Sequence, residues 1–407
     1  MGITLRLADE LTPTLLHPST PETLEAHSNS PITMSTPFTP VLGKPMPWTK
    51  DDLVKHLKTG MQVELGTIPL YFCALYSIKR DNGQWGSKAR ANILAVAEQE
   101  MLHLALAGNM LRALDGKQLL YDESFMPKYP SHILYDKIDM ELRPADKKNL
   151  DCFLKIEAPF MPAPVLGGEP EPFDTLLPSY NSIGEFYKEL QHGILEVSKD
   201  DPHLFSSNKE QQFTGAEFFD ERMTVVVDIQ TALKALETIV DQGEGSIGVP
   251  DSHYTIFVEL YHRRKEWVCI DYVDKPHTSD YKSRELAYRL SLAVDASYCY
   301  LLQTIDRCWA EESASKRTQL FRNIHRIMIE ILSPVAHVLV EQVVEGEKHA
   351  APCFEFYPRG SEALSPKALY DGLAAELACA YEVAAVHATK EAIAKIVFSL
   401  KAFPQEN

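Results

Sequence analysis

The sequence predicts an all-α protein, in which a four-helix bundle carries additional C-terminal helices packed on it. Three observations favour this fold class. Apolar residues recur at intervals of three and four along several long segments. Residues that suit helix ends flank several of these segments. Few segments show the alternation of apolar and polar residues that is typical of strands.

The first part of the chain differs from the rest. Residues 9–47 are rich in Pro, Thr and Ser, which disfavour regular structure. Residues 1–48 are therefore predicted to form an extended or disordered N-terminal arm.

The bundle is predicted over residues 49–270. Thr49 is a suitable N-cap for a helix that reaches about Ile78, because Asp51 and Asp52 follow it in the first turn. Further helices are predicted at residues 87–114, 184–197, 226–241 and 251–267. Residues 115–180 hold many prolines and few periodic runs, so they are expected to form a long irregular connection.

Residues 271–407 are predicted to form a C-terminal helical region. Its expected helices cover residues 283–309, 314–345 and 365–400. Ser365 and Pro366 favour the start of the last one, because they supply an N-cap and a proline at the first helical position.

Composition excludes several classes of protein. The chain has 407 residues, of which 45% are hydrophobic and 24% charged, as in an ordinary globular protein. Its net charge of −17 disfavours nucleic acid and anionic lipid as partners. Seven scattered cysteines without a Cys-x-x-Cys pair fit reduced thiols. With no uninterrupted apolar stretch of about 18 or more residues and no secretory signal, a cytoplasmic location is expected.

The most informative local pattern is Glu100-Met101-Leu102-His103. A Glu and a His three residues apart lie on the same face of a helix, so both can reach one metal ion. A carboxylate with an imidazole suits Fe, Mn or Zn better than Ca. Glu-x-x-His also occurs by chance, and a surface Glu beside a core histidine is the common explanation for an isolated example.

Two further carboxylates extend this pattern to other helices. Glu64 has apolar neighbours at 61, 65 and 68, so it is expected to be buried and to need a metal or a hydrogen-bonding partner. Glu185 opens the third helix, where it could instead be an acidic residue that complements the helix dipole. Both fit a bundle in which two helices give one Glu each and two give Glu plus His.

The fourth helix offers two pairs of ligands. One pair is Glu244 and His253, on either side of a Gly-rich break. The other is Glu259 and His262, a second Glu-x-x-His. Spacing alone favours Glu259 and His262.

Several motifs occur in the order found in one known family. They lie at residues 64–71, 74–79, 100–104, 127–130, 156–159, 183–187, 240–245, 252–254 and 351–355. In these stretches, which span roughly residues 50–360, the chain resembles the ferritin-like domain family first described from the violacein and indolocarbazole pathways, often labelled iminophenyl-pyruvate dimer synthase-like. The family pattern runs through Gln-Gly-Glu-Gly and then His-Tyr, so the resemblance favours Glu244 and His253 over Glu259 and His262.

The resemblance implies a ferritin-like fold and a metal centre held by Glu64, Glu100, His103, Glu185, Glu244 and His253. We expect two iron ions, with Mn as the alternative, because four carboxylates would balance the charge of two divalent cations. Tyr71 and Tyr187 are near these ligands in sequence and are candidate catalytic residues, although core packing is the more common role of such tyrosines.

The expected function is that of a non-heme di-iron oxidase or oxygenase acting on a small, largely apolar or aromatic metabolite, with O2 as co-substrate and a homodimer as one option for its assembly. The rival hypotheses are metal storage and a non-catalytic helical binding protein of a biosynthetic complex.

Overall fold

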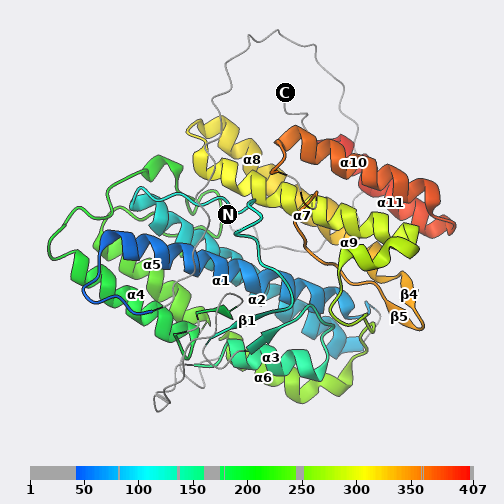
Figure 1. Cartoon of the computed structure of the whole chain (residues 1–407), viewed down its shortest axis with the longest axis horizontal. Helices are drawn as coiled ribbons and strands as arrows, with labels where there is room; N and C mark the ends of the chain where they lie inside the picture. Colours follow the sequence, from blue (N-terminus) through cyan, green and yellow to red (C-terminus); the bar gives the residue numbers. More distant parts are fainter. Residues whose placement is uncertain are drawn as a thin grey trace, which may run out of the picture.

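The computed structural model describes residues 43–80, 83–134, 138–159, 175–177, 179–243, 252–358, 360 and 362–403. Most of the predicted N-terminal arm, residues 1–42, lies outside these ranges. The described chain is mainly helical, which confirms the predicted fold class (Figure 1). Its helices are α1 (Lys50–Ser77), α2 (Gly83–Ala113), α3 (Lys147–Ile156), α4 (Ile183–Val197), α5 (Ile229–Gly243), α6 (His253–Arg263), α7 (Glu285–Ala310), α8 (Ala314–Arg326), α9 (Ser333–Val340), α10 (Pro366–Val383) and α11 (His387–Lys401).

The long helices α1 and α2 run side by side through the middle of the molecule (Figure 1). Helices α4 and α5 pack against them on one side, and α3 and α6 pack on each other beside them. Helix α1 begins with a capping box: the Thr49 hydroxyl accepts from the Asp52 amide, and the Asp52 carboxylate accepts from the Thr49 amide. Side-chain caps also start α3 at Asp146 and α6 at Ser252.

In the part of the chain that the structure describes, two small sheets accompany the helices. Strands β1 (Ser131–Ile133), β2 (Ile138–Met140) and β3 (Thr175–Leu176) lie in the order β2-β1-β3, with β1 antiparallel to β2 and parallel to β3. Strands β4 (Val343–Glu345) and β5 (Lys348–His349) form an antiparallel hairpin.

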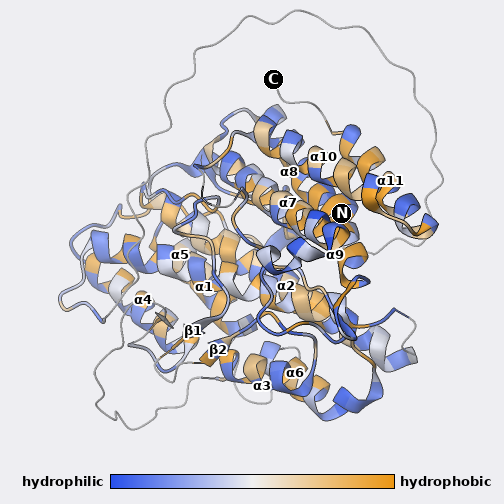
Figure 2. Ribbon diagram, turned by 45° about the vertical axis from the view of Figure 1, so that its right-hand side comes forward, coloured by the Kyte–Doolittle hydropathy of each residue, from blue (hydrophilic) through white to orange (hydrophobic). Residues whose placement is uncertain are grey.

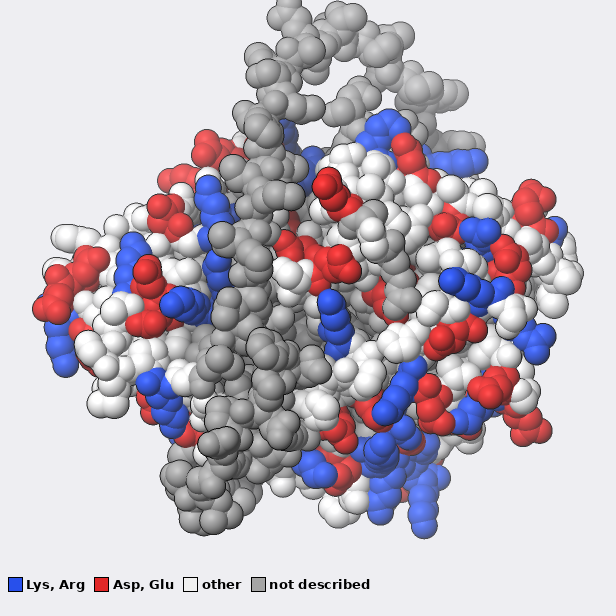
Figure 3. Space-filling model, in the orientation of Figure 1, with Lys and Arg blue, Asp and Glu red and all other residues white. Residues whose placement is uncertain are grey.

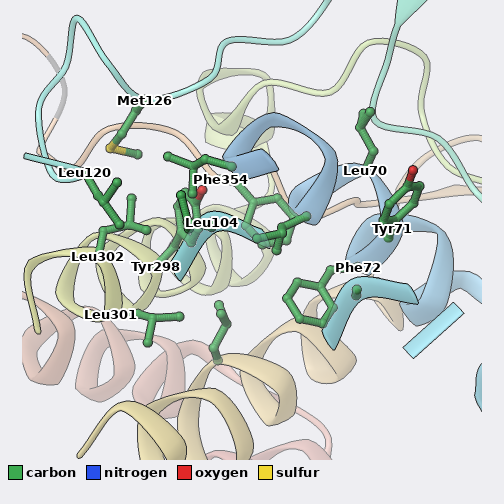
Figure 4. Packing of buried hydrophobic residues seen from close by; sticks show 14 of the residues in the cluster. Leu70, Tyr71, Phe72, Leu104, Leu120, Met126, Tyr298, Leu301, Leu302 and Phe354 are labelled. Carbon is green, nitrogen blue, oxygen red and sulfur yellow. The ribbon is translucent and has the colours of Figure 1, made fainter. Parts of the chain in front are cut away.

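The C-terminal helices pack on the bundle. Helix α7 contacts α8, α9 and α10, and α9 also contacts α1. Figure 4 shows Phe72 of α1, Leu104 of α2 and Leu301 of α7 within one apolar core. The outer helices α4 and α6 carry hydrophilic and hydrophobic residues on the same turns, as expected for helices with one face on the core (Figure 2).

The structure corrects three predicted segments. The region expected to be an irregular connection contains α3, a short amphipathic helix whose single buried face was too brief to show a clear period. A π-helical turn, Ile327–Leu332, divides the expected helix 314–345. The expected helix 365–400 is interrupted between α10 and α11, where no Gly or Pro signals a break.

The surface charges of the molecule and the hydropathy of its helices agree with the composition of an ordinary globular protein. Acidic and basic side chains are interspersed over the parts of the face in Figure 3 where described residues are visible. One helical run, Ala314–Val340, has the length and apolar content of a membrane span. Of its most apolar window, 56% is buried inside the molecule, as in a core helix, so it is weak evidence for a membrane segment.

Candidate metal centre

A buried carboxylate on α1 forms one wall of the centre. Glu64 lies in the middle of this helix and is 3% exposed. The Tyr187 hydroxyl of α4 donates a hydrogen bond to Glu64 Oε1. The carboxylate therefore points away from water, toward α2 and α4.

Helix α2 supplies the next two side chains. Glu100 and His103 lie one turn apart on the face toward Glu64, and both are almost fully buried. His103 Nδ1 is 3.5 Å from Glu64 Oε2 and 3.9 Å from Glu100 Oε1. The Thr67 hydroxyl, one turn after Glu64, donates to Glu100 Oε2 at 2.9 Å.

The end of α3 and the start of α6 complete the group. Glu157 is the C-cap residue of α3, and His253 is the first residue of α6. His253 Nδ1 is 3.3 Å from Glu157 Oε2 and 2.9 Å from Glu100 Oε1. The Tyr71 hydroxyl of α1 donates to Glu157 Oε1.

These side chains form two overlapping sets of metal-ligand type. In each set, one ligand atom per residue lies within 4.8 Å of the others. The sets are Glu64, Glu100, His103 and Glu100, Glu157, His253. Glu100 belongs to both sets, and its Oε1 is the oxygen that faces His103 Nδ1 and His253 Nδ1, so its carboxylate could serve both.

Two glutamine amides hold the histidines in a defined orientation. His253 Nε2 is 2.6 Å from Gln99 Oε1, and His103 Nε2 is 3.1 Å from Gln242 Oε1. An amide oxygen only accepts hydrogen bonds, so Nε2 donates to it and Nδ1 is left to take either a proton or a metal ion. Both Nδ1 atoms face carboxylate oxygens. Where Nδ1 carries no proton, the lone pairs of these facing atoms repel one another, and a bound cation between them would relieve that repulsion. The residues present therefore fit metal ions, with Gln99 and Gln242 as outer partners.

The pKa values of the carboxyl groups reflect the same crowding. Burial, reinforced by the charges of Glu64 and Glu157, raises the pKa of Glu100 well above its ordinary value. For Glu64, burial also acts to raise the pKa, but the hydrogen bond and charge of His103 outweigh it and lower the pKa. Burial and the Glu157 charge raise the pKa of Tyr71, which keeps its hydroxyl as a proton donor.

The structure brings together four of the six predicted ligands: Glu64, Glu100, His103 and His253. Glu244 lies outside the described residues. The residue before it, Gly243, borders the centre, since a Cβ added there would lie 3.8 Å from His103 Cε1. The predicted tyrosines Tyr71 and Tyr187 each hydrogen-bond a carboxylate of the group.

The structure does not bring Glu185 to the centre. It lies in the first turn of α4, where it accepts from Lys44 Nζ at 2.5 Å and from the Asn181 amide at 2.7 Å. These partners lower the pKa of Glu185 despite its partial burial. Glu185 therefore has the alternative role given for it in the sequence analysis, that of an acidic residue that complements the dipole at a helix N-terminus.

The second Glu-x-x-His pair lies at the surface. Glu259 Oε1 is 2.7 Å from Lys88 Nζ, with 43% of its side chain exposed. His262 is exposed near the end of α6. His253 thus joins the centre and Glu259 and His262 do not, as the family resemblance indicates.

Glu157 is the site residue that sequence reasoning missed. It belongs to the Ile-Glu-Ala-Pro motif at residues 156–159, which the family resemblance alone marks. A Glu that follows the apolar Ile156 directly at the end of a short amphipathic helix was the available signal. Because the sequence analysis predicts no helix at α3, it does not assign Glu157 to any helix of the bundle.

Comparisons with known proteins give a matching family and distant relatives. A family model described as ferritin-like matches residues 57–262. The chain is 25% identical over 395 residues to a dichlorochromopyrrolate synthase of Lentzea aerocolonigenes, an alignment covering 77% of this chain and 37% of that one. It is 24% identical over 241 residues to a 2-imino-3-(indol-3-yl)propanoate dimerase of Chromobacterium violaceum, covering 51% of this chain and 22% of the relative. The chain thus spans well under half the length of either relative.

A solved structure supports the fold. The crystal structure of a ferritin-like protein from Caulobacter vibrioides superposes with a TM-score of 0.51 at 23% identity, covering 69% of this chain and 95% of that one. The matched residues 57–262 are just over half of the 407 residues and include the five side chains of the centre. The chain belongs to the ferritin-like family.

Proposed function

We propose that this protein is a non-heme di-metal enzyme, a di-iron oxidase or oxygenase that uses O2 to oxidise a small, largely apolar or aromatic metabolite of secondary metabolism. The single observation that carries the proposal is the position of Glu100 between two buried carboxylate and histidine sets. Mn is the alternative metal, and a cytoplasmic location is part of the same proposal.

The proposed ligands are Glu64, Glu100, His103, Glu157 and His253. Three carboxylates carry three negative charges against the four positive charges of two divalent ions. One further anionic ligand would balance the site. Bound iron would supply the oxidising chemistry with O2, a task that side chains alone do not perform.

The protein's own groups have the remaining roles. Tyr71 and Tyr187 hold protons at hydroxyls that point at Glu157 and Glu64, where they orient each carboxylate and could return a proton to it. Gln99 and Gln242 fix the two imidazoles. The cavity lined by Glu64, Glu100, His103, Glu157 and Tyr187 is only about 20 Å³, which is room for about one water molecule.

The substrate class rests on the surroundings and on the relatives. Tyr71 packs against Phe153 and Phe257, with ring centroids 4.7 Å and 5.3 Å away. This side of the centre is therefore aromatic. One relative is named for an indolyl imino acid, which favours an aromatic amino-acid derivative among the substrates to try first.

The test is O2 reactivity after loading with Fe(II) under anaerobic conditions. Admission of O2 should produce near-ultraviolet and visible absorption and consume O2 in proportion to the protein. The Glu64→Ala variant should lose both responses and Glu259→Ala, a surface control from the rejected pair, should keep them. If Fe(II)-loaded protein does not react with O2 faster than free Fe(II), the proposed function is wrong.

A further inference from the structure

A second cavity lies on the other side of α1 and α2, between them and the C-terminal helices. It has two adjoining chambers, of about 60 Å³ and about 80 Å³. Phe72, Met101, Met328 and Leu332 line both chambers. Among the residues that the structure describes, none that lines the candidate metal centre lines either chamber, so α1 and α2 separate the two sites.

The smaller chamber is almost entirely apolar. Leu104 of α2, together with Leu301 and Trp309 of α7, adds to the shared residues. Figure 4 shows Phe72, Leu104 and Leu301 directed toward the same space. A dry space with such walls suits a hydrocarbon chain or an aromatic ring rather than water.

The larger chamber ends in polar groups, among which Arg90 is the key residue. Its Nη1 donates to the carbonyl oxygens of Leu75 and Ile78, at 3.2 Å and 3.0 Å. Its Nη2 is 3.4 Å from His337 Nε2. Among the residues that the structure describes, no carboxylate forms an ion pair with Arg90, although its side chain is largely buried.

A cation that is largely withdrawn from water and without a described counter-ion favours an anionic ligand. The neighbouring His337 does not compete for that anion. Its Nδ1 donates to the Ser333 carbonyl at 2.7 Å, which leaves the Nε2 lone pair facing Arg90. Tyr76 and Ser333 also line this end and offer hydroxyl groups.

The opposite end of the larger chamber carries Glu98. It lies eight residues beyond Arg90 on α2, about 12 Å along the helix axis at 1.5 Å per residue. Its carboxylate disfavours a second anionic group there. A ligand with one negative charge is therefore oriented with its acid toward Arg90 and its apolar part toward Met101.

The walls of the cavity also include the π-helical turn Ile327–Leu332. It contributes Met328 and Leu332, which lie between the two chambers. Such turns widen a helix locally and occur frequently at functional sites. The flexible side chains of Met101 and Met328 could move aside to join the chambers.

We propose that this cavity binds a small amphipathic monocarboxylate, with the carboxylate on Arg90 and an aromatic ring or short alkyl chain among Phe72, Met101, Met328 and Leu332. The size is suitable, since an apolar cavity of about 150 Å³ holds a benzene ring. The site is distinct from the metal centre and does not depend on the proposed oxidase function.

Calorimetric titration of the full chain with 3-phenylpropanoate and with 3-phenylpropanamide tests the proposal. The carboxylate should bind at least tenfold more tightly than the amide. Arg90→Gln should weaken carboxylate binding about tenfold and remove that preference, and Arg322→Gln, an exposed arginine on α8, should change neither. Met328→Trp should abolish binding by filling the space between the chambers.

Each contrary outcome overturns the proposal. No binding of 3-phenylpropanoate to the wild-type chain contradicts it, as does equal binding of acid and amide. If Arg90→Gln does not fold, two measurements still test the proposal. They are the ratio of the affinities of the wild-type chain for 3-phenylpropanoate and 3-phenylpropanamide, and the binding of 3-phenylpropanoate by Met328→Trp. Loss of binding in the Glu100→Ala variant would place the ligand at the metal centre instead. Binding retained by the Glu100→Ala variant supports a separate site, even if the oxidase proposal fails.

Discussion

Glu157 and Glu185 have the same side chain but opposite surroundings. Glu157 is buried beside His253 and Tyr71, where an unbalanced carboxylate is costly. Glu185 lies in a first helical turn and is balanced by Lys44. The two residues therefore form a matched pair for a test of which carboxylate binds metal.

We expect Glu157→Gln to lower the metal content from two ions per chain to one or fewer, with at least a tenfold loss of affinity at the affected position. The reason is that the amide carries no charge and is a poor ligand for a hard cation. Elemental analysis of purified protein measures the effect, with Glu185→Gln as the control that keeps both ions. A loss of metal in Glu185→Gln with none in Glu157→Gln would reverse the assignment.

His337 provides a residue-scale prediction about pH. Burial, together with the charges of Arg80 and Arg90, lowers the pKa of His337 to about 4. Between pH 6.5, the ordinary pKa of histidine, and pH 4, His337 binds a proton in the unfolded chain but not in the folded chain. Stability from this group is therefore present above pH 6.5 and is lost as the pH falls toward 4, by on the order of 2 kcal/mol at pH 5.

His337→Gln should reduce the loss of stability between pH 7 and pH 5 by about that amount, because glutamine does not titrate. Urea unfolding at the two pH values measures it. An unchanged difference between the two pH values would show that His337 is not buried in its neutral form.

At the scale of elements, the contact of the Trp309 ring of α7 with α2 depends on one glycine. A Cβ at Gly108 would lie 2.2 Å from Trp309 Cζ2, well inside contact distance. Gly66 of α1 has more room, since a Cβ there would meet Met140 Cε at 3.5 Å and Leu176 Cδ1 at 3.9 Å, both ordinary contact distances.

Gly108→Ala should therefore destabilise the protein by about 1–3 kcal/mol through overpacking. Gly66→Ala should be neutral or stabilising by up to about 1 kcal/mol, because alanine favours the helix. Thermal and urea unfolding of both variants compare the two. Equal effects of the two substitutions would mean that α2 and α7 are not packed as described.

The elements also show what the sequence could predict. Long helices with continuous apolar faces, such as α1 and α2, were predicted together with Glu64, Glu100 and His103, because periodicity and spacing are local properties. Helix α3 and its Glu157 were not, because ten residues carry little periodic signal. Similarly, local sequence could not reveal that Lys44 would meet Glu185 across 141 positions.

At the scale of the molecule, buried residues of the bundle and of the C-terminal helices form one apolar cluster. Asp306 of α7 connects the two parts directly. Its two carboxylate oxygens accept from the Leu120 and Tyr121 amides, at 2.8 Å and 3.0 Å. The boundary at residue 271 between the bundle and the C-terminal helical region stays a prediction, and this continuity argues that the two parts unfold together.

Asp306→Ala should lower the stability of the whole chain by on the order of 3 kcal/mol, because two buried amides lose their acceptors. Hydrogen exchange should speed up in α2 as well as in α10, and Asp371→Ala, an exposed residue on α10, should have little effect. Faster exchange confined to residues 271–403 would indicate independent domains.

The central claim is that Glu100 lies between two metal positions. Its most direct test is elemental analysis of freshly purified wild-type protein beside the Glu100→Ala/His103→Ala double variant, with folding checked by circular dichroism. The account predicts two transition-metal ions per wild-type chain, and a folded double variant that retains none or a small fraction of them. Two ions per chain in the folded double variant, or none in the wild type after reconstitution with Fe(II), would contradict it.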